Sequence, residues 1–174
     1  MTRLTTYLFL ATLLIAWPVN AQEESIDWTH LPWGSSHTTF LAPFGSPVVK
    51  YQFSFEIQEY LSKKNELTHY RVPAVEFADV EFEIYFYEDL SSHRLAKIEL
   101  QWKTRTSDWA AQEKVVTTAT ARLTKLFGSP AHTRGGTTHQ SAYWSAGTTL
   151  ATLSVLKNQN INSGRVNIRF SRSN

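Results

Sequence analysis

Strict alternation of apolar and polar residues in the middle of the chain is the feature that most constrains its fold. From Ala78 to Tyr87 every even position is apolar, and the odd positions carry acidic residues or tyrosine. A period of two predicts a β-strand that buries one face. The segment 96–102 repeats the alternation after a short polar stretch, so the two strands are expected to form an antiparallel hairpin.

The segment that follows this hairpin is predicted to be one long helix, over residues 108–127. Trp109, Val116, Ala119, Leu123 and Leu126 recur at helical spacing and would form one apolar stripe. The sequence then continues with Gly-Ser-Pro at 128–130. Glycine suits the left-handed position after a helix, and proline cannot continue one.

Other segments with strand-like patterns lie on both sides of the helix. They are predicted at 48–57, 67–72, 141–145, 148–156 and 165–171. One long helix beside several antiparallel strands predicts an α+β fold, in which the helix packs on an antiparallel sheet. Residues 22–174 are expected to form this single domain.

A four-residue string occurs twice, as Phe44-Gly45-Ser46-Pro47 and as Phe127-Gly128-Ser129-Pro130. Two interpretations stay open. The chain contains two degenerate helix-plus-strands repeats, over 28–103 and 107–172, or a common helix-ending sequence occurs twice by chance.

The first residues have the pattern of a secretion signal. A positive charge at Arg3 precedes the apolar run 7–17, and Pro18 and small residues follow up to Ala21. We therefore expect a signal peptide over 1–21, cleaved between Ala21 and Gln22, and a periplasmic or secreted protein. The alternative is an uncleaved anchor, but the run is shorter than the roughly 20 apolar residues that span a bilayer, so no membrane span is expected in the mature form. The chain has no cysteine, which excludes a lipid-attachment cysteine and disulfides.

The overall charge balance argues against a nucleic-acid partner. The chain has 17 Lys and Arg against 15 Asp and Glu, a formal net charge of +2. An excess this small predicts no strong electrostatic field for nucleic acid or an anionic membrane.

The sequence patterns that could indicate a catalytic or metal-binding site are weak. The six histidines lie at least seven residues apart, so neither a metal nor a cofactor is expected. His132 and His139, on either side of a glycine-containing loop, are the best pair. Glu81 and Glu83 have the spacing of a glycosidase carboxylate pair, but any solvent-facing strand shows such acids. No catalytic residue is therefore predicted.

A binding surface has better support from the sequence. Tyr85 and Tyr87 share a strand face with Glu81 and Glu83. Adjacent aromatics on a polar face can anchor a protein partner or stack on sugars, although a covering element would instead make them core. The remaining candidate binding residues are Trp33, Arg134, His139 and Tyr143.

This order of helix and antiparallel strands resembles small modules of bacterial envelope proteins, such as the beta-lactamase-inhibitor-like and outer-membrane-assembly lipoprotein folds. The resemblance covers most of the chain after residue 21 as architecture alone, so no functional residue is carried over. The leading hypothesis is a non-enzymatic protein that binds another envelope protein, as an inhibitor, an immunity-type protein or an accessory subunit. The alternatives are a glycan- or small-molecule-binding domain and an unrecognised hydrolase.

Overall fold

The computed structural model describes residues 26–44, 48–50, 62–63, 66–102, 109–136, 139–158 and 163–173. The predicted signal peptide, most of the predicted strand 48–57 and the first Gly-Ser-Pro string lie outside these residues. The N-terminal half contains the elements α1 (His37–Leu41), η2 (Ala42–Phe44), β1 (Val49–Lys50), β2 (Glu66–Phe77), β3 (Val80–Asp89) and β4 (Leu95–Trp102). The C-terminal half contains α3 (Trp109–Phe127), β5 (His132–Arg134), β6 (His139–Ala146), β7 (Thr149–Asn158) and β8 (Ser163–Arg172).

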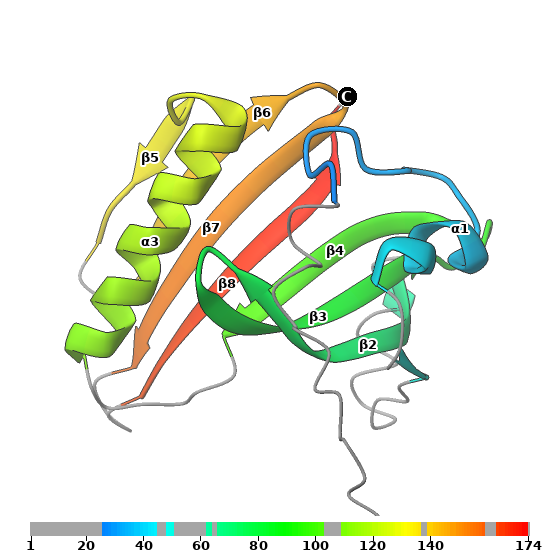
Figure 1. The fold of residues 1–174 in the computed structure, drawn as a ribbon, viewed down its shortest axis with the longest axis horizontal. Coiled ribbons are helices and arrows are strands. Elements are labelled where there is room, and N and C mark those ends of the chain that lie inside the picture. Colours follow the sequence, from blue (N-terminus) through cyan, green and yellow to red (C-terminus); the bar gives the residue numbers. More distant parts are fainter. Residues whose placement is uncertain are drawn as a thin grey trace, which may run out of the picture.

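The strands form one antiparallel sheet, which confirms the predicted α+β fold (Figure 1). Its described strands run in the order β1-β2-β3-β4-β8-β7-β6-β5, so β4 and β8 meet at the centre and β1 and β5 form the edges. Each half contributes four consecutive strands in mirrored order. The two-repeat interpretation would produce this order, but the helices differ in length, with 19 residues in α3 and five in α1. The repeat stays a hypothesis.

Both helices pack on the same face of the sheet. Phe40 of α1 stacks on Phe86 of β3 with 5.5 Å between ring centroids, and Phe127 of α3 stacks on Phe170 of β8 at 6.2 Å. Phe86 and Phe170 point to the same side, so the helices and the sheet form two layers with the core between them. We call the opposite side of the sheet the outer face.

An aromatic cluster joins the two halves within this core. The Trp28 ring lies 4.8 Å from Phe170 and 5.4 Å from Phe77, and all three side chains are buried. Phe77 ends β2 and Phe170 lies on β8, so the segment that contains Trp28 ties together strands from both halves.

The long helix agrees with its prediction in position but presents a slightly different face. Its buried residues are Gln112, Val115, Ala119, Leu123 and Phe127, rather than a stripe that includes Val116 and Leu126. Gly128 has a φ of 82°, the left-handed conformation predicted for the residue after the helix.

The start of the alternating segment is a turn rather than a strand. Ala78 and Asp79 both have a φ of 57° and form the two-residue connection between β2 and β3. Two consecutive residues with positive φ match the twist of a tight hairpin. The sequence predicted a strand there because Ala78 continues the apolar alternation. The short strand β5 was not predicted from the sequence.

Candidate functional site

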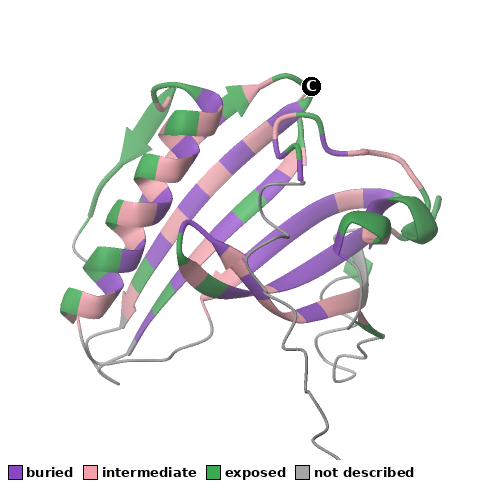
Figure 2. Ribbon diagram, viewed as in Figure 1, coloured by how far each residue is buried: buried purple, intermediate pink, exposed green. Residues whose placement is uncertain are grey.

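The two halves of the outer face differ in how much of it is accessible. Along β3 and β4, residues that point to either side of the sheet are buried, whereas β7 and β8 alternate between buried and more accessible residues (Figure 2). The outer face is therefore closed over β3–β4 and open over β7–β8. A binding surface has to be sought first in the open half.

The predicted site tyrosines lie in the closed half. Tyr85 and Tyr87 point to the outer face, yet they are only 7% and 6% exposed. Both are absent from the hydrophobic core between the layers. The Lys97 ammonium lies 3.8 Å from the centroid of the Tyr87 ring and covers it as a cation–π partner. Both tyrosines are therefore buried, as the alternative of a covering element expected, but they lie on the outer side of the sheet and outside the cluster between the layers.

The neighbours of Tyr85 form a charged cluster. Arg71 Nη1 lies 2.7 Å from Glu83 Oε1, and the Tyr85 hydroxyl donates a hydrogen bond to Glu83 Oε2 at 2.9 Å. Burial, followed by the bond to the Glu83 carboxylate, raises the pKa of Tyr85 to about 12, because both disfavour a second negative charge. Glu83 is therefore occupied as an ion-pair partner, while Glu81 is exposed near the β2–β3 turn. The ion pair with Arg71 gives Glu83 a structural partner, and no described feature assigns either carboxylate a catalytic role.

Three of the predicted site residues gather in the open half. His132 pairs with Tyr143 across β5 and β6, and the two rings stack with centroids 6.0 Å apart. Arg134 Nε donates a hydrogen bond to His132 Nε2 at 3.3 Å. His139 begins β6 on the same face and is exposed. The structure thus places Arg134, Tyr143 and His139 along the β5–β6 edge of the outer face, together with His132.

Two arginines extend this cluster to the centre of the sheet. Arg165 and Arg169 of β8 alternate with the buried Val166, Ile168 and Phe170, so they point to the outer face. The Arg169 side chain is 54% exposed and lies 3.7 Å from Glu99 of β4. Neither arginine was among the predicted site residues, although their alternation with apolar residues indicates an outward position. We call the outward side chains of β5–β8 the basic face, defined by His132, Arg134, His139, Tyr143, Arg165 and Arg169.

The tryptophans lie on the other side of the sheet. Trp33 is half-buried against the core, and its Nε1 donates a hydrogen bond to Thr149 Oγ1 at 3.1 Å. Trp144 is fully buried. Trp33 therefore connects the N-terminal segment to the start of β7. It lies on the opposite side of the sheet from the other predicted site residues.

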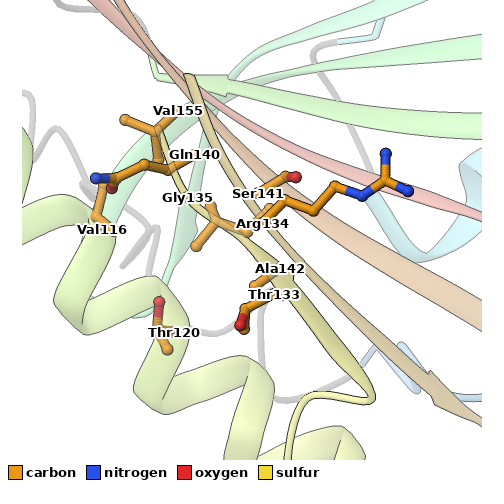
Figure 3. A pocket seen from close by; sticks show the side chains of 10 residues that line it. Val116, Thr120, Thr133, Arg134, Gly135, Gln140, Ser141, Ala142 and Val155 are labelled. Carbon is orange, nitrogen blue, oxygen red and sulfur yellow. The ribbon is translucent and has the colours of Figure 1, made fainter. Parts of the chain in front are cut away.

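A pocket lies between α3 and the β5–β6 edge of the sheet (Figure 3). It measures about 300 Å³, with Val116, Ala142, Leu153 and Val155 as apolar lining and Thr120, Thr133 and Gln140 as polar lining. The Arg134 guanidinium points away from this space in Figure 3. The volume is at the small end of ligand pockets, which begin at roughly 300 Å³.

A polar group in the N-terminal segment superficially resembles a catalytic one. Asp27 Oδ1 accepts hydrogen bonds from the backbone N–H groups of Thr29 and His30, at 3.0 and 3.2 Å, and from Thr29 Oγ1 at 2.7 Å. The Thr29 hydroxyl lowers the pKa of the Asp27 carboxyl most. These bonds close a local turn, because the hydroxyl donates to the acid instead of to the imidazole.

The part of the chain that the structure describes contains no cluster of potential metal ligands. Among those residues, no group of three or more His, Asp and Glu side chains has the arrangement of a metal site. His132 is paired with Tyr143, four residues along β6 from His139, which corresponds to about 13 Å of strand. That separation is too large for the two imidazoles to share one ion.

The arrangement defines an α+β protein with a helix-covered face and a partly open outer face. No helix within the described ranges combines the length and hydropathy needed to cross a bilayer. No protein-family model, curated protein or solved structure matches the chain. The architectural resemblance to envelope modules therefore stays an expectation.

Proposed function

We propose that this is an exported, non-enzymatic protein of the cell envelope that acts by binding another protein through the basic face. An inhibitor, an immunity-type protein and an accessory subunit of an envelope assembly all work in this way. The observation that carries the proposal is the open outer face of β5–β8, where no described helix packs and where arginine, tyrosine and histidine side chains gather.

The composition of this face supports protein binding. Arginine and tyrosine are enriched at protein interfaces, because the guanidinium forms several hydrogen bonds and the tyrosine ring buries a large rigid area. The face also carries hydroxyls, including those of Thr152 and Ser154 on β7, which suit the polar contacts of an interface. Localisation in the periplasm or outside the cell rests on the signal-peptide pattern of residues 1–21.

Site-specific photocrosslinking in the cell tests this proposal. A photoreactive amino acid is placed at Thr152 or Leu156 on the outer face, with Thr117 and Ala121 on the exposed side of α3 as controls. We expect one protein adduct from both outer positions and none from the helix. The same adduct from the helix alone, or no adduct from a folded and exported protein, would contradict the proposal.

The pocket beside α3 supports a second candidate function, binding of a small molecule or a glycan fragment. Its apolar lining and polar rim have the composition of ligand sites. Titration with sugars and peptidoglycan fragments, followed by amide chemical shifts, tests this candidate. Saturable shifts at Thr120, Thr133 and Gln140, abolished by Thr120→Trp, would favour it over protein binding.

A further inference from the structure

The near-neutral net charge hides a strong separation of charge along the chain. After Glu113 the sequence contains no Asp or Glu, but it contains eight Lys and Arg residues up to the C-terminus. All fifteen acidic residues precede that point, with nine basic ones. The residues up to 113 therefore carry a formal charge of −6, and residues 114–174 carry +8. The absence of a strong field, expected from the whole-chain sum, does not describe the C-terminal half.

The fold places three of these cations on the basic face. Arg165 and Arg169 lie four residues apart on β8, and Arg134 lies at the β5 edge. Arg165 is opposite Leu156, and Leu156 is opposite His139, so one row across three strands contains an arginine, an exposed leucine and a histidine. Within the described ranges, no carboxylate forms an ion pair with Arg134 or Arg165.

On the closed half, the outward arginine and lysine that the structure describes both have partners on the neighbouring strand. Arg71 contacts Glu83, and Lys97 covers Tyr87. At the boundary between the halves Glu99 contacts Arg169. Among the outward arginines on the described strands, Arg134 and Arg165 are therefore the two without an ion pair. Since arginine binds carboxylates with two parallel hydrogen bonds, these cations suit a partner that presents carboxylates.

From this distribution, and building on the proposed function, we infer that the partner docks an acidic protein surface on the basic face, with Arg134 and Arg165 as its main contacts. Leu156, which is 46% exposed, supplies an apolar contact between them. A ring of polar groups around an apolar contact is the usual composition of a protein interface.

Other anionic partners fit this face less well. Binding of single-stranded nucleic acid uses several exposed aromatic rings for base stacking, whereas Tyr143 is the only Phe, Tyr or Trp on the outward positions of β5–β8. Glu83 and Glu99 on the neighbouring strands would repel a polyphosphate laid across the whole sheet. An anionic membrane would attract the same arginines, but one exposed leucine is a small apolar anchor.

Defined anionic probes and matched charge variants test the inference. The full chain is expressed, and the exported protein is titrated with labelled poly-L-glutamate, a single-stranded DNA oligonucleotide and phosphatidylglycerol vesicles at two salt concentrations. Arg134→Gln/Arg165→Gln is compared with Lys114→Gln/Lys125→Gln, which removes the same charge from exposed positions on α3 in the same half. Thermal unfolding verifies that both variants fold.

We expect poly-L-glutamate to bind the unmodified protein most tightly, and the arginine variant to weaken that binding roughly tenfold. The lysine variant should change the affinity by less than about twofold. Equal losses in both variants, tighter binding of DNA or vesicles than of poly-L-glutamate, or no binding of any probe would each overturn the inference. The proposed function would survive such a result if the photocrosslinked adduct still formed from Thr152 and Leu156, and both would fail if it did not.

Discussion

The two halves of this protein each contribute four described strands to one sheet, but their outward residues differ in accessibility. In β3 and β4 the outward residues include buried tyrosines and two glutamates that form ion pairs with arginines of neighbouring strands. In β7 and β8 the outward residues are more accessible, and the arginines lack acids of their own half. The comparison indicates that accessibility and unpaired charge, more than residue type, distinguish the open half, which we propose as the binding surface.

The first prediction concerns the core that the two halves share. Phe170 contacts Trp28, Phe77 and Phe127, so Phe170→Ala should leave a cavity at the junction and reduce the free energy of unfolding by about 3–5 kcal/mol. Urea denaturation should show one cooperative transition for both halves. Two separate transitions would mean that the halves fold as independent units.

The second prediction compares equivalent positions on the closed and open parts of the outer face. Tyr87→Ala removes a buried ring that lies under Lys97 and should reduce stability by about 2–3 kcal/mol. Leu156→Ala, at an exposed position, should change it by less than about 0.5 kcal/mol. Equal effects in denaturation experiments would show that the difference in burial between the halves has no energetic consequence.

A smaller effect is expected where the N-terminal segment meets the β6–β7 turn. At Gly147, with a φ of 56°, an added Cβ would lie 2.6 Å from the backbone oxygen of Thr29. Gly147→Ala should therefore cost about 1–3 kcal/mol through backbone strain and displacement of this segment. Gly135→Ala is the matched control, because an added Cβ there meets no atom within 4 Å. A tolerated Gly147→Ala in differential scanning calorimetry would argue against this contact.

The smallest expected effect is a pH dependence specific to the closed half. The pKa of Tyr85 is about 12 in the folded protein, against an ordinary value of 10.0. Above pH 10 the unfolded chain loses this proton while the folded chain keeps it, so stability falls as pH rises towards 12. Tyr85→Phe should lose less stability over this interval than the unmodified protein. Parallel curves in chemical denaturation at pH 9, 10 and 11 would contradict the burial of the hydroxyl.

The sequence predicted much of the fold because period-two and helical patterns are local. The β3–β4 hairpin, α3 and the strands at β6, β7 and β8 follow from such patterns. The short strand β5 could not be predicted, since its three residues are exposed and form a strand only by pairing with β6. Ala78 was assigned to a strand because a tight turn with positive φ at alanine has no clear sequence signal.

The candidate site was harder to predict because accessibility depends on neighbouring strands. Tyr85 and Tyr87 share the outer face with Glu83 as the alternation required, but their burial could not be predicted from the alternation of one strand. Arg134, His139 and Tyr143 were identified separately, and only the pairing of β5 with β6 brings them together. The charge separation is visible in the sequence, but the opposite charges of the two halves nearly cancel in the net charge of the whole chain.

The most direct test of the central claim combines the photocrosslinker at Leu156 with the two charge variants in living cells. Leu156 lies directly opposite Arg165, so an adduct formed there reports a partner on the basic face. We predict that Arg134→Gln/Arg165→Gln abolishes the adduct and that Lys114→Gln/Lys125→Gln preserves it. An adduct that persists after the arginines are neutralised would contradict the claim that their unmatched charge makes this face the binding surface.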